Sequence, residues 1–255
     1  MKSSINPLTS TPVSILLGAL IIGFAILFAQ GAIVFSKDSN GQTKVSFNQP
    51  GKQAALPQVA GVAAPAAPGQ PPAPVPGTKV DVSAGHFSSK GKDGAKVQIV
   101  EFADFQCPFC EKFFKDTETQ IIKDYVDTGK ATFAFRSYAF LGQESTWASE
   151  AAECANEQGK FWEYHDYLYS HQGPENSGAF AKDKLEGFAG AVGLNAVQFK
   201  DCLETDKYAQ KVKDDMSDGQ KVGVNGTPAT FVNGILISGA QPYANFQSAI
   251  DAALK

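Results

Sequence analysis

The chain has 255 residues, and its 26 acidic residues outnumber its 22 basic ones to give a formal net charge of −4. This acidic balance argues against a nucleic acid as a partner. The sequence has no glycine-rich phosphate-binding loop, no flavin-binding fingerprint and no catalytic Ser/His/Asp set, so we expect no cofactor.

The first predicted element is residues 13–35, an apolar stretch of 23 residues without a charge. A helix of this length is about 34 Å long, which is enough to cross a bilayer. A cleaved signal peptide is the alternative, but the stretch is long for one and Leu27-Phe28-Ala29 is a poor cleavage site. We therefore predict an uncleaved single-pass anchor with residues 1–12 in the cytoplasm. The flanking lysines do not decide this orientation, which depends on the chemistry described below.

The next segment, residues 36–78, is predicted to be a disordered linker. Its second half, residues 57–76, consists mainly of proline, alanine, glycine, valine and glutamine. Such a composition buries too little apolar surface to fold and favours extended polyproline conformations. A proline-rich ligand for a peptide-binding module is the alternative, but a semi-rigid spacer fits a tethered domain better.

Residues 79–255 have the length of one domain with a substantial core. The β-branched run at residues 97–102 predicts a buried strand, and apolar spacing predicts a helix over residues 107–127. Residues 131–138 alternate with period two, which indicates a second strand. A strand–helix–strand unit implies a parallel pair with a right-handed crossover.

A helical insertion is predicted at about residues 144–222, because this region has helical patterns and no convincing strand. Strand patterns return at residues 229–232 and 235–237, joined by Asn233-Gly234 as a tight hairpin turn. A last helix is expected over residues 243–254. The fold class is therefore α/β, a small mixed sheet interrupted by helices. The helical patterns of the insertion cover residues 146–158, 161–169, 183–191, 196–204 and 208–220.

The motif Cys107-Pro-Phe-Cys110 lies where the first strand ends and the helix begins. Pro108 is tolerated in a first turn, where its missing N–H would have had no partner. A thiol at a helix N-terminus faces free N–H groups, which favour its thiolate. Two cysteines at this spacing can form and reopen a small ring. The motif therefore predicts thiol–disulfide exchange, with a structural disulfide or half of a metal site as alternatives.

Two separate segments carry a resemblance to a known family. Glu101-Phe-Ala-Asp-Phe-Gln-Cys107-Pro-Phe-Cys110, the helical insertion, and Gly223-Val-Asn-Gly-Thr227-Pro228-Ala-Thr-Phe-Val-Asn-Gly234 together resemble the DsbA-like branch of the thioredoxin superfamily. The resemblance implies a thioredoxin fold with a helical insertion and a protein-disulfide oxidoreductase activity. It also implies that Cys107 is the attacking thiol and Cys110 the resolving thiol.

The resemblance implies roles for further residues of the site. Thr227-Pro228 matches the cis-proline loop, where Thr227 would present backbone groups to an extended substrate peptide; an ordinary turn proline is the alternative. Glu101 matches the buried acid that relays a proton to the second cysteine, with a solvated edge glutamate as the alternative. Residues between the cysteines, here Pro108 and Phe109, tune the thiolate. Because Phe109 supplies no cation, we expect a Cys107 pKa in the middle or upper part of about 3.5 to 7.

Cys154 and Cys202 lie in helical patterns of the insertion. Some DsbA-like relatives have a second disulfide at similar places, which together with an oxidising compartment implies a structural disulfide here. Two buried free thiols or a metal site are the alternatives. No histidine lies near either cysteine at a usual ligand spacing, so we predict no metal.

These predictions combine into one functional hypothesis. We expect a membrane-anchored, extracytoplasmic oxidoreductase that introduces disulfides into unfolded exported proteins with cysteines. A partner in the membrane would reoxidise it. A disulfide reductase or isomerase is one alternative, and a non-catalytic tethered peptide-binding chaperone is another. If the N-terminal segment were cleaved, the protein would be secreted instead.

Overall fold

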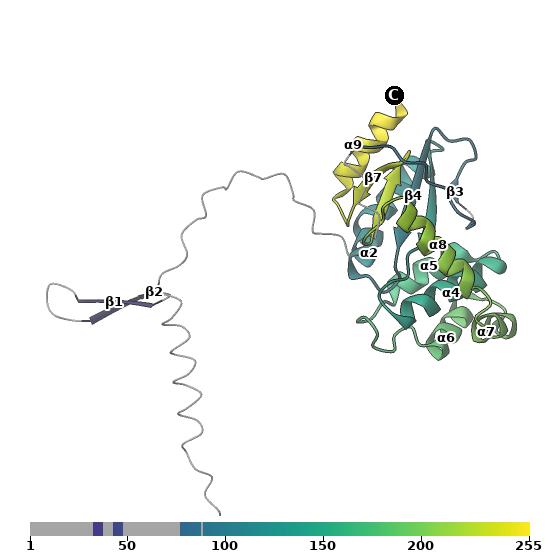
Figure 1. Cartoon of the computed structure of the whole chain (residues 1–255), viewed down its shortest axis with the longest axis horizontal. Helices are drawn as coiled ribbons and strands as arrows, with labels where there is room; N and C mark the ends of the chain where they lie inside the picture. The colour runs from purple at the N-terminus through teal and green to yellow at the C-terminus, as the bar shows by residue number, and fades with distance from the viewer. Residues whose placement is uncertain (1–32, 38–42, 48–76, 88) are drawn as a thin grey trace, which may run out of the picture. The chain divides into compact units, whose positions relative to one another are not determined.

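The computed structural model describes residues 33–37, 43–47, 77–87 and 89–255, which fall into two separate units (Figure 1). The unit Met1–Ala64 contains an antiparallel hairpin of β1 (Ile33–Lys37) and β2 (Thr43–Phe47). The unit Pro65–Lys255 contains the remaining elements.

The hairpin differs from our expectation for this part of the chain. Residues 33–35, assigned to the end of the membrane span, lie in β1, and residues 43–47 of the expected linker pair with it as β2. In β2, the β-branched or aromatic residues Thr43, Val45 and Phe47 alternate with the polar residues Lys44 and Ser46, a pattern that favours a pleated strand. β1 instead begins with three consecutive apolar residues, 33–35, that continue the predicted span. The rest of the predicted span, residues 13–32, lies outside the described residues, as do residues 38–42 and 48–76 of the linker. Among the described helices, none is both long and apolar enough to span a bilayer.

A five-stranded mixed sheet organises the second unit, in the order β3-β5-β4-β6-β7. Only β4 and β5 are parallel, with Val97 opposite Ala131, and the other neighbours are antiparallel. The parallel pair and the β6–β7 hairpin confirm the predicted strands. β3 was not predicted, because a two-residue strand has no periodicity to detect. The strands are β3 (Lys90–Gly91), β4 (Val97–Ala103), β5 (Ala131–Ser137), β6 (Ala229–Val232) and β7 (Ile235–Ser238).

One continuous helical segment connects β4 to β5, as the sequence predicted. Two π-helical stretches interrupt it, and no pattern in the sequence predicted them. In a π turn the backbone hydrogen bonds reach five residues back rather than four, so the turn holds about one extra residue. The segment consists of α2 (Pro108–Phe113), η1 (Phe114–Glu118), α3 (Thr119–Ile121) and η2 (Ile122–Val126).

The helical insertion lies between β5 and β6 in the sequence and confirms the prediction of five helices there. Figure 1 shows α4 to α7 gathered at one end of the sheet, while the last helix, α9 (Tyr243–Leu254), lies at the other end. The helices are α4 (Gln143–Glu157), α5 (Phe161–Ser170), α6 (Lys182–Val192), α7 (Ala196–Glu204) and α8 (Ala209–Lys221).

The sheet and the insertion share one hydrophobic core. Phe105, directly after β4, stacks on Phe135 of β5 with ring centroids 5.0 Å apart and contacts Tyr169 of α5. The same cluster contains Cys107 and Cys110. Because dense packing transmits displacements, the insertion supports the segment that carries the two cysteines.

Arg136, the single arginine of the chain, joins β5 to α8. Its guanidinium donates to Asp215 at 2.8 Å and to Asp218 at 2.9 Å, and it also donates to the carbonyl of Ser83. Arg136 is 3% exposed. The planar guanidinium can bind several acceptors in fixed directions, which suits a buried junction of three segments.

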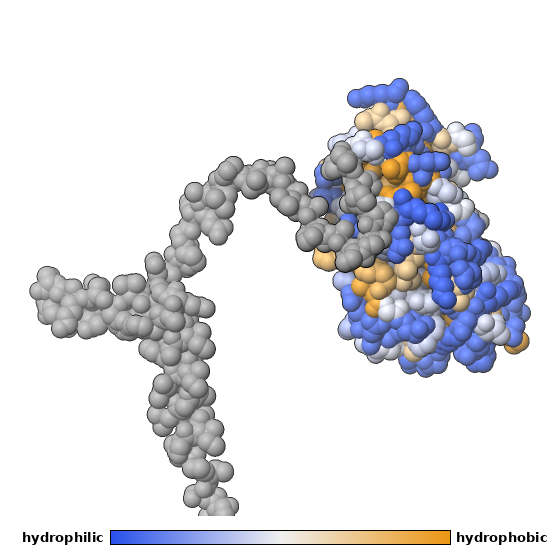
Figure 2. Space-filling model, viewed as in Figure 1, coloured by the Kyte–Doolittle hydropathy of each residue, from blue (hydrophilic) through white to orange (hydrophobic). Residues whose placement is uncertain are grey.

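The surface of this unit is mainly hydrophilic on the face shown in Figure 2. An apolar area lies there over β7, whose Ile235 is exposed while Leu236 and Ile237 are half-buried. Phe109, in the first turn of α2, is also exposed.

Candidate active site

Cys107 is the residue at which the backbone turns from an extended conformation into helix α2. Its φ and ψ are −72° and 120°, and Pro108 follows as the first helical residue. The carbonyl of Cys107 accepts hydrogen bonds from the N–H groups of Cys110 at 3.0 Å and Glu111 at 3.1 Å. Both cysteines are free thiols; Cys107 is 5% exposed and Cys110 is fully buried. Only Cys107 therefore has access to a substrate.

The two thiols have opposite acidities. The hydrogen bond from the Cys110 thiol is the largest cause that lowers the pKa of Cys107. Thr227 and the N–H groups of Cys110 and Phe109 lower it further. Together they outweigh the effect of burial, which raises this pKa, and bring it to about 6. Burial, followed by the interactions with Cys107, raises the pKa of Cys110 well above its ordinary value. The lowered pKa favours a thiolate at Cys107, and the raised pKa favours a thiol at Cys110.

The loop that precedes β6 lies against Cys107. Thr227 and Pro228 are joined by a cis peptide bond. The Cys107 thiol donates to the carbonyl oxygen of Thr227 at 3.5 Å, within the range of a hydrogen bond from sulfur. Residues 120 positions apart in the sequence thus meet at the Cys107 sulfur.

Glu101 lies in β4, is 1% exposed and interacts electrostatically with both cysteines. Burial raises its pKa well above the ordinary value, and the neighbouring Glu118 and Cys107 raise it further. Glu101 in turn contributes to the raised pKa of Cys110. A carboxyl that keeps its proton beside a thiol of high pKa can exchange that proton with the sulfur.

Comparison with known proteins gives the same assignment as this geometry. A family model described as Thioredoxin matches residues 85–252, about two thirds of the chain. The chain belongs to the DsbA-like thiol–disulfide oxidoreductases of the thioredoxin superfamily.

Similar proteins include the probable disulfide bond formation protein D of Bacillus cereus, 33% identical over 172 residues, a match that covers 66% of this chain and 78% of that protein. The disulfide bond formation protein D of Bacillus subtilis is 30% identical over 169 residues, 65% of this chain and 76% of that protein. The crystal structure of oxidised BdbD from Bacillus subtilis superposes with a TM-score of 0.62 at 28% identity and covers 69% of this chain and 99% of that one. The thioredoxin fold with a helical insertion is thereby confirmed.

In this oxidoreductase, the loop directly before Cys107 is held in place by two residues that were not predicted from the sequence. Asp104 is fully buried, and its carboxylate accepts from the N–H groups of Gln106, Phe140 and Leu141 at 2.9 to 3.1 Å. Gln172, just after α5, donates to the carbonyls of Phe105 at 2.7 Å and Cys107 at 3.1 Å. The insertion thus contacts the peptide group of Cys107 itself. A polar residue three positions before Cys107 was the available signal for Asp104; Gln172 had none.

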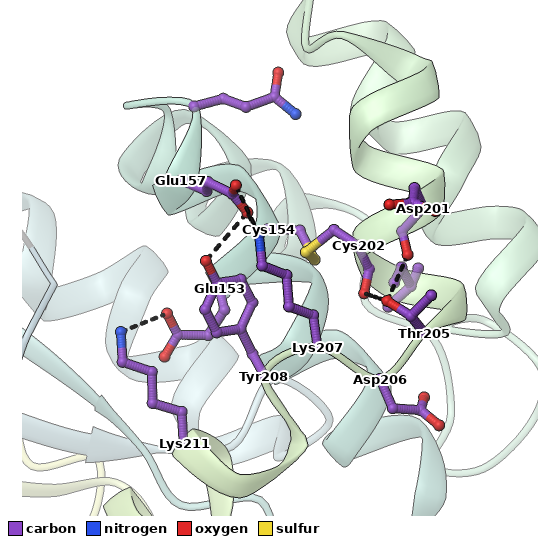
Figure 3. The surroundings of a disulfide bond; sticks show 12 residues. Glu153, Cys154, Glu157, Asp201, Cys202, Thr205, Asp206, Lys207, Tyr208 and Lys211 are labelled. Carbon is purple, nitrogen blue, oxygen red and sulfur yellow. Dashed lines mark hydrogen bonds and ion pairs between the residues drawn. A yellow bond between two sulfur atoms is a disulfide. The ribbon is translucent and has the colours of Figure 1, made fainter.

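Cys154 and Cys202 of this oxidoreductase are joined by a disulfide between α4 and α7, with Cα atoms 5.9 Å apart (Figure 3). Both are nearly fully buried. Figure 3 shows the bond flanked by a surface ion pair in which Lys207 binds Glu157 at 2.8 Å. This position connects two helices of the insertion and lies outside the Cys107–Cys110 site. No cluster of His, Cys, Asp and Glu that could hold a metal ion occurs among the residues of the described part of the chain.

Proposed function

We propose that this oxidoreductase introduces disulfides into unfolded exported proteins through Cys107 and Cys110. The observation that carries the proposal is the difference in acidity between the two thiols. A Cys107 pKa of about 6 means that the thiolate of the reduced enzyme is stabilised, and it makes this sulfur a good leaving group from the mixed disulfide. A disulfide whose reduced form is stabilised is an oxidant towards other thiols.

The proposed reaction begins with the oxidised enzyme. A substrate thiolate attacks the Cys107 sulfur, the Cys107–Cys110 bond breaks, and Cys110 takes a proton from Glu101. A second substrate thiolate then attacks the substrate sulfur of the mixed disulfide, and Cys107 leaves as a thiolate. The substrate has lost two electrons and gained a disulfide, while the enzyme disulfide has gained those electrons and become a dithiol.

The shape of the site favours an extended substrate. Because Cys107 is only 5% exposed, a thiol on a rounded, folded surface would not reach it easily. Thr227, which lies beside the sulfur, would hold the peptide through its backbone groups, in the manner of strand addition. Pro108 and Phe109 would complete the site from the other side.

A complete cycle needs a partner that removes the two electrons. We propose a membrane protein that reoxidises Cys107 and Cys110, with residues 13–35 as the single-pass anchor that keeps the catalytic domain outside the cytoplasm. The names of the Bacillus relatives, disulfide bond formation proteins, support this direction of electron flow. Fractionation of cells that express the full chain would test the anchor. If the anchor is present, the protein should be recovered with the membranes.

Oxidation of a reduced, unfolded protein by the full chain, with an added oxidant, tests the catalytic assignment. The Cys107→Ser variant should lose all activity, because no sulfur remains to be attacked. Cys110→Ser should instead accumulate mixed disulfides with substrate, because the resolving thiol is absent. Wild-type activity in Cys107→Ser would disprove the assignment, and the exposed-site change Val197→Ser serves as the control.

A further inference from the structure

Four buried polar side chains lie together beneath the cysteines, and the proposed cycle uses only one of them. Glu101 of β4, Glu118 of η1, and His165 and Tyr169 of α5 are each no more than 2% exposed. Glu101 Oε2, Glu118 Oε2, His165 Nε2 and the Tyr169 hydroxyl each lack a hydrogen-bond partner among the residues that the structure describes. Buried polar groups are normally paired, so an unpaired cluster of this kind requires an explanation.

The π-helical turn explains how Glu118 comes to lie in this cluster. Eight residues of regular α-helix would rotate Glu118 about 80° away from the direction of Cys110. The stretch Phe114–Glu118 is π-helical and absorbs about one extra residue, which brings this offset down to about 20°. Glu118 therefore lies on the same buried face of the segment as Cys110 and Phe113.

Electrostatic interactions connect the members of the cluster. Glu118 raises the pKa of Glu101, and Cys110, Glu101 and Glu118 all raise the pKa of Tyr169. Burial is the largest effect on Glu118 and raises its pKa. His165 and, to a smaller extent, Lys90 of β3 lower this pKa, and Asp166 raises it. The charged groups that face Glu118 thus come from β3, β4 and α5.

His165 connects this interior to solvent. Its Nδ1 is hydrogen-bonded to the carboxylate of Asp166 at 2.8 Å, and the Asp166 side chain is 48% exposed. Lys90 lies 3.9 Å from the same carboxylate. Six aromatic rings enclose the imidazole at centroid distances of 5.0 to 5.8 Å: Phe105, Phe114, Phe135, Phe161, Trp162 and Tyr169. An imidazole that gains a proton at one nitrogen and releases one at the other transfers a proton without moving.

We propose that Glu118 and His165 form a proton relay that connects Glu101 to the surface at Asp166. When Cys110 leaves the enzyme disulfide, the Glu101 carboxyl gives it a proton and becomes a carboxylate. Glu118 then gives a proton to Glu101, His165 gives its Nε2 proton to Glu118, and Nδ1 takes up a proton from solvent by way of Asp166. When Cys110 attacks a mixed disulfide, each transfer runs in reverse. This inference rests on the proposed function, since it needs Cys110 to gain and lose a proton in every cycle.

Thiol–disulfide exchange between the full chain and glutathione tests the relay, because both directions are measured on one sample. The Glu118→Gln variant should slow reduction and reoxidation of Cys107–Cys110 by the same factor, about tenfold at neutral pH, as expected for lost proton transfer. The equilibrium constant with glutathione should stay within about twofold of wild type, because a relay changes rates in both directions equally. A purely structural or electrostatic role would shift that constant.

Further variants make the test specific. His165→Phe keeps a ring inside the aromatic enclosure and should cause the same slowing, and the double variant should be no slower than either single one because both groups act in series. Glu111→Gln, a change on the same helical segment but at a residue paired with Lys115, should match wild type. If Glu118→Gln does not fold, Glu118→Met replaces it with the same expectation.

Two results would overturn the relay: wild-type rates in Glu118→Gln and His165→Phe, or slowing in one direction alone. If the wild-type chain did not exchange with glutathione at all, the proposed function would fail before the relay could be judged.

Discussion

At the scale of single residues, the active site depends on one sulfur being acidic and its neighbour not. The hydrogen bond from Cys110 stabilises the Cys107 thiolate, and burial keeps Cys110 protonated. Phe109 lies between them in the sequence and is 62% exposed, and it contributes its backbone N–H but no charge. The helix N-terminus and the hydrogen bonds thus supply most of the thiolate's stabilisation.

Replacing Phe109 with histidine should therefore lower the Cys107 pKa further. A protonated imidazole near the thiolate favours the charged form, by at most about one pKa unit because an exposed charge is screened. The reduction potential would rise by at most about 30 mV, since the reduced form is stabilised. Thiolate absorbance as a function of pH measures the pKa. Val197→His on α7, another exposed position, is the control, and an unchanged pKa in Phe109→His would show that this side chain does not affect the sulfur.

Glu101 should make stability depend on pH. Its pKa is raised in the folded protein, so the folded state holds a proton that the unfolded state loses above about pH 4.5. The stability that this proton supplies is complete below that pH and is lost as the pH rises through the folded pKa. Glu101→Gln should therefore be more stable than wild type at pH 8 by at least about 1 kcal/mol, with the difference vanishing towards pH 4.

Urea unfolding of the oxidised proteins measures this difference, because oxidation prevents Cys107 from titrating. The exposed change Glu175→Gln should leave stability unaltered at both pH values. Equal stability of Glu101→Gln and wild type at pH 8 would mean that Glu101 is ionised without cost in the folded state.

The sequence could predict part of this site. Cys107 and Cys110 follow from their spacing at the start of a helix, and Glu101 and Thr227 from their place in a family motif. Glu118, His165 and Gln172 could not be found in this way. Glu118 faces inward only because of a π turn, and Gln172 reaches the Cys107 carbonyl from a loop 65 positions away. Neither a break in helical register nor a long-range contact leaves a local pattern in one sequence.

At the scale of elements, helices and strands agree with the sequence wherever periodicity is strong. The β6–β7 hairpin is an example, because Asn233 and Gly234 have φ angles of 47° and 83°, which Asn-Gly turns adopt readily. The extended conformation of residues 33–37 was harder to predict from the sequence. In residues 33–37 an apolar run continues from the predicted span, and apolar content alone does not separate a strand from the end of a helix.

The disulfide between α4 and α7 gives a prediction at this scale. Cys154 and Cys202 close a loop of about 49 residues, for which the chain-entropy relation gives about 4 kcal/mol. A Cys154→Ala/Cys202→Ala variant should lose about that much free energy of unfolding in urea. Its exchange equilibrium with glutathione at Cys107–Cys110 should stay unchanged. A loss below about 1 kcal/mol, or a changed equilibrium, would contradict a purely structural role for this bond.

At the scale of the whole catalytic unit, the insertion and the sheet form one body rather than a fold with an appendage. The aromatic core runs from Phe135 of β5 to Tyr169 of α5. Asp104 and Gln172 hold the loop directly before Cys107 in place. A substrate that contacts the insertion would therefore act on a rigid site. Composition alone predicts neither the shared core nor these contacts, because both arise from segments brought together by the fold.

The buried Arg136 has a practical consequence for experiments on this protein. An arginine-specific protease has one cleavage site in the chain, and that site lies inside β5, where the protease cannot reach it while the sheet is intact. Cleavage thus reports the opening of the whole sheet. Cys107 and Cys110 precede the cut, and Cys154 and Cys202 follow it, so the two fragments separate on a non-reducing gel in any redox state. The rate at which these fragments accumulate would measure the unfolding of the oxidised and the reduced protein alike.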